Sequence, residues 1–164
     1  MTTEAEPAGT VASAWARARP ELDVRPIEVF GRLRRLQELH DQALEPLYDG
    51  APLGQSEVAV LILLRYPEQP LIARQLARQR GCSRAAMGKI LAKLEQRALV
   101  TRQPNPADRR AALVEITPAG VALVDDYFPR QLALEARVLS AFDEAWRSTL
   151  VDALDALSAE LREA

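Results

Sequence analysis

The lysines and arginines of this sequence are the side chains whose distribution points to a function, because nearly half of them lie in one stretch. Residues 71–110 hold ten of the 21 lysines and arginines but only two of the 23 aspartates and glutamates, a local net charge of +8. The rest of the chain carries −10. A solvated helix surface could explain scattered charge, but a basic block in an acidic protein is typical of a surface that binds a polyanion. The basic residues are Arg74, Arg78, Arg80, Arg84, Lys89, Lys93, Arg97, Arg102, Arg109 and Arg110.

Enzyme and metal-site patterns are missing from the sequence. The chain has one histidine and one cysteine, and it has no glycine-rich phosphate loop and no Gly-x-Ser-x-Gly motif. We therefore expect no catalytic residue, no metal site and no cofactor. His40 falls on the apolar face of a predicted helix, where a hydrogen-bonded core or interface residue is commoner than a ligand or pH sensor. Cys82 precedes a helix start, and we expect a small buried side chain there, with a redox switch as the alternative.

Length and composition indicate one mostly helical domain. The 164 residues can bury a core, and only 5% of them are aromatic, while leucine, alanine and arginine are abundant. No apolar run approaches the roughly 20 residues of a membrane span, and the first ten residues do not resemble a signal peptide. A single cysteine suits a reducing compartment. We expect a cytoplasmic protein that does not contact a membrane.

A helix-turn-helix is predicted inside the basic stretch. Residues 71–80 predict a short helix that ends at Gly81, a residue suited to the left-handed conformation after a helix. Ser83 is expected to cap a second helix that runs to about Ala98. Two helices joined by a tight glycine turn form the helix-turn-helix of DNA-binding proteins.

The outward face of the second helix suits the major groove of DNA. Its residues are small or cationic, so the helix can lie deep in a groove about 12 Å wide. We expect Arg84 and Lys89 to reach base edges, while Ser83 and Lys93 contact phosphates. The predicted DNA-binding residues of this helix are Ser83, Arg84, Ala85, Gly88, Lys89 and Lys93.

A β-hairpin is predicted to follow. Strands over 99–103 and 112–117 flank a connection that contains two prolines and two arginines. A stiff cationic tip of this kind is a wing that can reach the adjacent minor groove, where narrow A·T stretches attract arginine. The predicted DNA-binding residues of the hairpin are Arg102, Asp108, Arg109 and Arg110.

The flanking helices are expected to form a dimer interface, because two half-sites about 34 Å apart are usually read by a dimer. Apolar stripes run along a helix from Pro26 to about Leu47 and along a C-terminal helix from Trp146 to Leu161, although an intramolecular bundle explains such stripes equally well. Pro129 is expected to kink the helix that starts at Pro118. The predicted divisions are a disordered tail (1–10), N-terminal dimerisation helices (11–50), a winged helix-turn-helix (51–120) and C-terminal dimerisation helices (121–164).

The order and spacing of these motifs resemble the MarR family of bacterial winged-helix regulators, over about residues 27–163. In that family the aspartate and second arginine of the wing hold the hairpin and enter the minor groove, roles that the resemblance places on Asp108 and Arg110. Ile72 departs from the pattern, because a capping Ser or Thr is usual there. The motifs that carry the resemblance are Leu76-Ala77, Gly81, Ser83, Leu91-Ala92-Lys93-Leu94-Glu95, Leu99-Val100, Asp108-Arg109-Arg110 and Val114-Glu115-Ile116-Thr117-Pro118-Ala119-Gly120.

The N-terminal residues resemble the branch of this family that has an extra first helix and that includes urate-responsive regulators. We expect Trp15 to pack that helix onto the body, and Trp15 and His40 are candidates for an effector pocket. Ala59 and Ile90 stand where the urate pattern has Asp and Arg, so a urate anion would be buried without its partners, at a cost of several kcal/mol. The sequence therefore argues against urate as the ligand.

The resemblance implies a homodimeric repressor that binds a pseudo-palindromic operator on double-stranded DNA. By analogy, a small aromatic or lipophilic effector between the dimer helices and the DNA-reading part would release it. Two alternatives stay open, a winged-helix module that binds an acidic protein partner and a redox-sensing regulator that uses Cys82.

Overall fold

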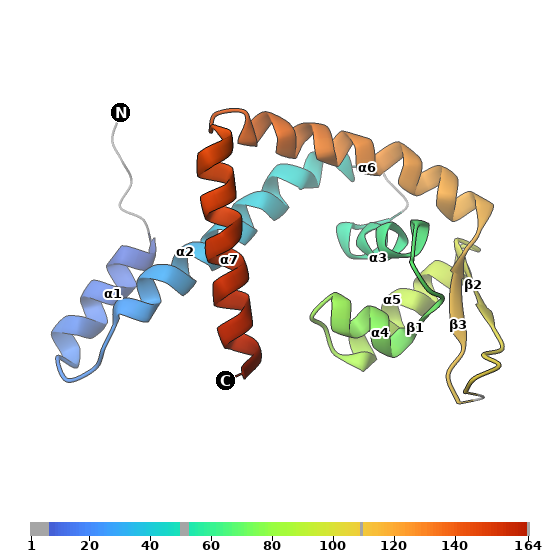
Figure 1. Cartoon of the computed structure of the whole chain (residues 1–164), viewed down its shortest axis with the longest axis horizontal. Helices are drawn as coiled ribbons and strands as arrows, with labels where there is room; N and C mark the ends of the chain where they lie inside the picture. Colours follow the sequence, from blue (N-terminus) through green and yellow to red (C-terminus); the bar gives the residue numbers. More distant parts are fainter. Residues whose placement is uncertain (1–6, 50–52, 109, 164) are drawn as a thin grey trace. The chain divides into compact units, whose positions relative to one another are not determined.

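The structure is a computed structural model that describes residues 7–49, 53–108 and 110–163. The chain forms two compact units, Met1–Pro52 and Leu53–Ala164. The described part is mostly helical with one small antiparallel sheet (Figure 1). The predicted fold class, a mainly α-helical chain with a β-hairpin wing, is therefore confirmed.

The first unit consists of two helices and a short 3-10 turn. Helix α1 spans Pro7–Ala18, helix α2 spans Arg25–Leu44, and η1 spans Glu45–Leu47. The predicted disordered tail is thus wrong for its last four residues, because proline is well tolerated in a first helical turn and α1 starts there. Residues 1–6 lie outside the described part. Helices α1 and α2 pack on each other.

Helix α3 (Gln55–Arg65) lies at the centre of the second unit. The four side chains Val58, Val60, Leu61 and Leu64 are buried, as expected for a helix that is apolar nearly all round. The Glu57 carboxylate accepts a hydrogen bond from the Gly54 N–H at 3.1 Å. The predicted start of this helix is confirmed.

The helix-turn-helix is formed by α4 (Ala73–Gln79) and α5 (Arg84–Gln96). Between them Gly81 has a φ of +61°, the left-handed conformation that glycine adopts without strain. The Ser83 hydroxyl accepts a hydrogen bond from the Ala86 N–H at 3.1 Å and caps α5. The predictions of the turn and of the cap are confirmed.

The predicted helix start at residue 71 is wrong, because Leu71 and Ile72 form the short strand β1. They pair with Val114 and Leu113 of strand β3 (Leu113–Ile116). An isoleucine cannot cap a helix through its side chain, and the Ile72 N–H instead donates to Gln75 Oε1 at 2.9 Å. The chain is therefore extended up to the first turn of α4.

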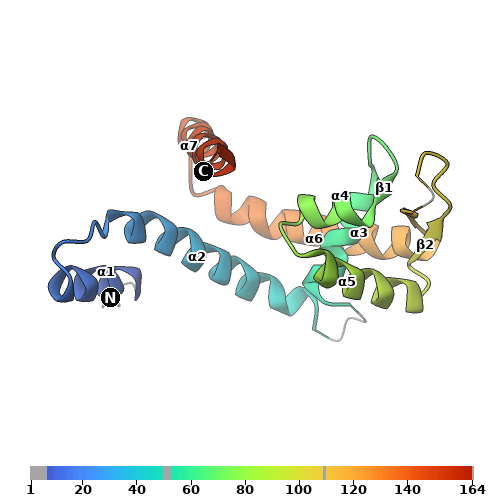
Figure 2. The ribbon, with the colours of Figure 1, turned by 90° about the horizontal axis from the view of Figure 1, so that it is seen from below.

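Strand β2 (Val100–Gln103) completes a sheet of order β1-β3-β2. Val100 pairs with Ile116 and Gln103 with Leu113, so the predicted hairpin is confirmed. The hairpin lies beside the helix-turn-helix in the views of Figures 1 and 2.

Helix α6 (Pro118–Leu139) starts directly at the end of β3. The Thr117 N–H donates to the Leu99 carbonyl at 3.0 Å, and the Thr117 hydroxyl donates to the Ala98 carbonyl at 2.7 Å. The same hydroxyl accepts the Gly120 N–H at 3.1 Å. A Cβ on Gly120 would lie 2.4 Å from the Leu99 carbonyl oxygen, so only glycine fits. This junction fixes α6 on the hairpin.

The C-terminal half of α6 and helix α7 (Glu144–Glu163) contain no buried side chain. The helix continues past Pro129, the position of the predicted kink. Figures 1 and 2 show α7 projecting from the far end of α6, away from α3, α4 and α5. Trp146 stacks on Phe142 with ring centroids 3.9 Å apart.

Candidate nucleic-acid interface

Helix α5 has one buried face and one open face. Met87, Leu91 and Leu94 are fully buried and fix the rotation of the helix about its axis. A Cβ on Gly88 would meet no atom within 4 Å, so packing does not require glycine there. The small residue on the open face is therefore not explained by packing, and this face is free to approach another molecule. Five of the six predicted DNA-binding residues on this helix are exposed, namely Ser83, Arg84, Ala85, Lys89 and Lys93, and Gly88 is intermediate.

The wing tip is held by short-range hydrogen bonds to its own backbone. Asn105 Oδ1 accepts the Ala107 N–H at 2.9 Å, and Asp108 Oδ1 accepts the Arg110 N–H at 2.9 Å. Asp108 thus shapes the turn that carries Arg110, whose residue is exposed. Arg109, also predicted to bind DNA, lies outside the described residues.

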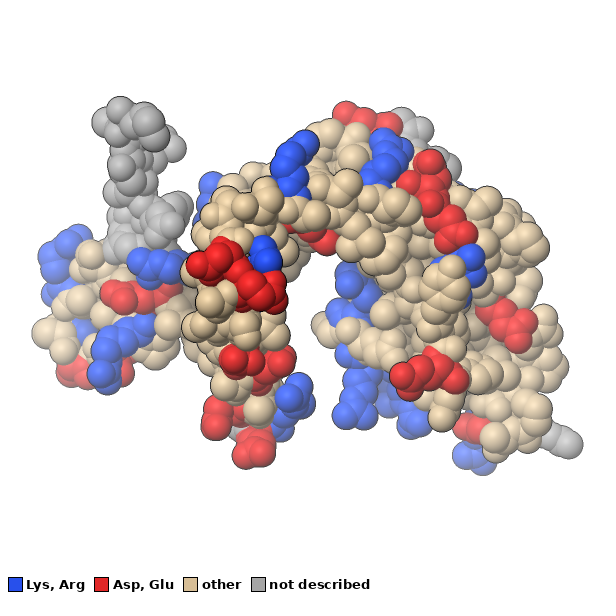
Figure 3. Space-filling model, turned by 45° about the horizontal axis from the view of Figure 1, so that its top comes forward, with Lys and Arg blue, Asp and Glu red and all other residues tan. Residues whose placement is uncertain are grey.

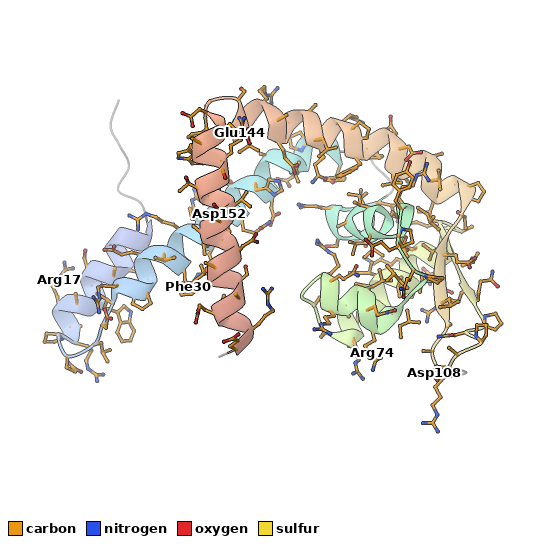
Figure 4. The ribbon with its side chains drawn as sticks, viewed as in Figure 1. Arg17, Phe30, Arg74, Asp108, Glu144 and Asp152 are labelled. Carbon is orange, nitrogen blue, oxygen red and sulfur yellow. The ribbon has the colours of Figure 1, made fainter. Side chains whose placement is uncertain are left out.

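A hollow of about 340 Å³ lies between the start of α4, the start of α5 and the wing. Four arginines and one aspartate are among its lining residues, so the hollow is cationic. Figure 4 shows two of its lining residues, Arg74 and Asp108, on the same side of the second unit. The lining residues are Ile72, Ala73, Arg74, Arg84, Arg102, Asp108, Arg110, Ala111 and Ala112.

The cations of this region differ in their partners. Within the described part of the chain, the side chains of Arg74, Arg84 and Arg110 form no hydrogen bond and no ion pair. Arg102 instead donates to Glu95 at 2.9 Å. Unpaired guanidinium groups around one hollow are suited to bind an anion such as a phosphodiester. Figure 3 shows lysine and arginine side chains gathered on this side of the second unit.

Sequence reasoning missed Arg74 as a site residue. Its charge was counted in the basic stretch, but its place beside Arg84 and the wing depends on the pairing of β1 with β3. That pairing joins residues about forty positions apart, and the local pattern contains no signal for it.

Lys93 differs from the other predicted DNA-binding residues of α5, because a carboxylate of another helix binds its ammonium group. Its Nζ lies 3.1 Å from Glu57 Oε1 on α3, in an ion pair between two helices of the same unit. The other predicted residues of α5 have no such partner on α3 in the described structure.

Two strong carboxylate–arginine pairs lie outside this interface. Hydrogen bonds from Arg65 on α3 lower the pKa of Asp125 on α6. In the first unit, hydrogen bonds from Arg25 lower the pKa of Asp23 to about 2. These arginines are occupied by carboxylates, in contrast to Arg74, Arg84 and Arg110 around the hollow.

The two effector-pocket candidates lie in the first unit. Trp15 on α1 is 49% exposed, so α2 covers only part of it. His40 on α2 is partly buried, with Nδ1 4.0 Å from Asp41 Oδ1. The effector-pocket prediction stays a prediction.

Cys82 lies in the turn before α5 and is partly exposed, so the expectation of a small buried side chain there is wrong. The residue lies in the turn between α4 and α5 and not on the buried face of either helix. Among the described residues no group of three His, Cys, Asp or Glu side chains could hold a metal ion. No described helix is both long and apolar enough to cross a membrane.

Comparisons with known proteins agree with this geometry. The family model of the MarR family matches residues 53–112, the part that contains α3, the helix-turn-helix and most of the hairpin. The HTH-type transcriptional regulator PecS of Dickeya dadantii is 29% identical over 142 residues, covering 85% of this chain and 86% of PecS.

Solved structures share the fold. A MepR–DNA complex of S. aureus superposes with a TM-score of 0.72 at 16% identity, covering 78% of this chain and 94% of that chain. BpsR of Bordetella bronchiseptica, described with 6-hydroxynicotinic acid, has a TM-score of 0.70 at 25% identity and covers 79% and 92%. The curated relative is named a transcriptional regulator, and residues 53–112 of this chain match the MarR family.

Proposed function

We propose that this regulator binds a pseudo-palindromic operator as a homodimer and represses transcription. The observation that carries the proposal is the cationic hollow, which joins the start of the recognition helix α5 to the wing. A DNA backbone that passes from a major groove into the next minor groove would run between these two elements. Three of the four arginines that face it, Arg74, Arg84 and Arg110, have no carboxylate partner in the described structure, whereas Arg102 is paired with Glu95.

The contacts divide into base readout and phosphate binding. In this proposal Arg84 and Lys89 reach base edges from the open face of α5, and Ser83 donates its hydroxyl proton to a phosphate while it caps the helix. Arg110 enters the flanking minor groove on the loop that Asp108 holds. Arg74 and Arg102 line the same hollow and bind the phosphates between the two grooves.

Homodimerisation is supported by the apolar side chains of the C-terminal helix. On α7 the side chains of Trp146, Val151 and Leu161 are 41%, 55% and 59% exposed, and a second copy of the chain would cover them. In this proposal residues 11–50 and 121–164 form the dimer, and residues 51–120 form the DNA-reading domain.

A small aromatic or lipophilic effector is the proposed release signal. BpsR, whose DNA binding is described as regulated by 6-hydroxynicotinic acid, is similar to this chain over 79% of its length. An effector that binds better to one spacing of the two recognition helices shifts the dimer toward that spacing, and the operator is then released if the spacing does not fit. Trp15 and His40 are the proposed pocket residues.

The first experiment is fluorescence anisotropy of the purified protein on DNA from its own upstream region and on a scrambled duplex, across a salt series. Binding with dimer stoichiometry that exceeds scrambled DNA by about 1,000-fold or more is expected. No binding at low salt would overturn the proposal and favour a protein-interaction module with an acidic partner. A Cys82→Ser variant with and without peroxide tests the redox alternative, which predicts that only the parent protein loses DNA binding.

A further inference from the structure

Glu57 is the one charged residue that is buried among the residues described, with 8% of its surface exposed. Both of its carboxylate oxygens are occupied. Oε2 accepts the Gly54 N–H at 3.1 Å, and Oε1 accepts a hydrogen bond from Lys93 Nζ at 3.1 Å. A buried carboxylate needs such partners, because an unpaired charge is strongly disfavoured away from water.

The position of this carboxylate is fixed by the start of α3. Glu57 is the third residue of the helix and completes its first turn through the Gly54 N–H. A Cβ on Gly54 would lie only 3.0 Å from Oε2, which shows how closely the carboxylate sits on the backbone. The carboxylate therefore cannot follow the lysine outward, whereas the lysine has a flexible four-carbon stem.

Two lysines one helical turn apart on α5 thus have different environments. Lys89 is exposed and has no ion pair in the described structure. The Lys93 side chain is 64% exposed, but its ammonium group is bound by a carboxylate that is 10% exposed. The bond links the last turn of the recognition helix to the first turn of α3.

We propose that Glu57 holds Lys93 as an internal counterion, so that Lys93 positions the recognition helix on α3 and does not neutralise a DNA phosphate. Glu57 thereby sets how many cations of α5 contribute to sequence-independent affinity, which rises with each phosphate neutralised. The inference rests on the proposed binding of DNA by α5, and it differs from the expectation that Lys93 contacts a phosphate.

Four variants of the full chain test it on a scrambled duplex over a sodium chloride series, with thermal unfolding as the check of folding. On a scrambled duplex Lys89 has no matching base edge and is expected to lie against a phosphate, so the control Lys89→Met should reduce the slope of log affinity against log salt by about 0.9 per half-site. The double variant E57Q/K93M should keep the slope of the parent protein. Glu57→Gln alone keeps an oxygen for the Gly54 N–H but frees Lys93, so its slope should be steeper by about 0.9 per half-site and its affinity at low salt higher. Lys93→Met alone leaves the carboxylate unpaired and should unfold at a lower temperature than the double variant.

The outcomes separate this inference from the proposed function. A double variant whose slope falls as far as that of Lys89→Met would make Lys93 a phosphate ligand and overturn the inference. An unchanged slope in Glu57→Gln would overturn it as well, because the freed lysine should reach DNA. An unchanged slope in Lys89→Met would instead count against the placement of α5 on DNA.

Discussion

The DNA-reading part and helix α7 are equally rich in apolar residues but bury them differently. Most fully buried side chains lie on α3, α4 and α5, where Leu61, Leu76 and Leu91 have no exposed surface. Helix α7 has leucines at similar spacing and no buried residue. Helical periodicity therefore identifies a face that packs, but it does not identify the partner. The core of the DNA-reading part closes within the chain, whereas the apolar face of α7 would be covered by a second copy in the proposed dimer.

The largest expected effect comes from a charge on the open apolar face. Leu154→Asp on α7 should abolish dimerisation, because a carboxylate would be buried between two copies. Loss of two-site binding should weaken operator affinity by roughly 100- to 10,000-fold. Sedimentation measures the oligomeric state, and anisotropy measures the affinity. Ala159→Asp adds the same charge on the opposite side of α7 and should remain dimeric, whereas a dimeric Leu154→Asp protein would refute this interface.

A cavity in the closed core should have the next largest effect. Leu91→Ala on α5 removes a side chain with no exposed surface and should lower the free energy of unfolding by about 2–5 kcal/mol. Urea unfolding followed by circular dichroism measures the loss. The neighbouring Ala92→Ser lies on the open face and should change stability by less than about 0.5 kcal/mol. Equal losses in the two variants would contradict the assigned faces of α5.

Removing the wing cation should affect DNA binding without affecting either apolar face. Arg110→Ala should weaken operator binding by about 1–3 kcal/mol and flatten the preference for flanking A·T pairs, with unchanged unfolding. Anisotropy on operators with A·T and G·C flanks measures both quantities. Arg137→Ala on α6 removes an equal charge far along the chain from the wing and serves as the control. If Arg110→Ala bound like the parent protein, the wing assignment would be wrong.

The smallest effect concerns a strained residue at the start of the hairpin. Ala98 has a φ of +54°, in the left-handed region that costs a residue with a Cβ about 1–2 kcal/mol. Ala98→Gly should therefore raise the free energy of unfolding, by about 0.5–1 kcal/mol after the extra freedom of glycine in the unfolded chain is counted. Thermal unfolding measures the change, and a lower melting temperature would refute the argument.

Features that depend on near neighbours could be predicted from the sequence. Ser83 caps the backbone three residues ahead, Gly81 ends the preceding helix, and Glu57 bonds to Gly54. Each is a local interaction that only a few residue types make well. The position of helix α5 and most of the residues on its open face follow from these signals.

Features that depend on distant pairing could not be predicted. The strand at Leu71–Ile72 exists because β3 lies beside it, and its apolar residues suit a helix equally well in isolation. The bond between Lys93 and Glu57 joins positions 36 residues apart, so the spacing on α5 gave no signal that Lys93 has a carboxylate partner. The place of Arg74 in the hollow likewise depends on the pairing of β1 with the distant strand β3.

The junction at Thr117 joins the wing and α6 so that the two elements move together. No loop separates them, three hydrogen bonds join them, and the space at Gly120 admits no methyl group. The 22 residues of α6 span about 33 Å, so a tilt of the helix by about 5° at this junction moves its far end by about 3 Å. Conversely, a displacement of a few ångströms where α6 leads into α7 is reduced to a small rotation of the hairpin. The contacts at Thr117 and Gly120 thus set how much the far end of α6 moves for a given rotation of the hairpin.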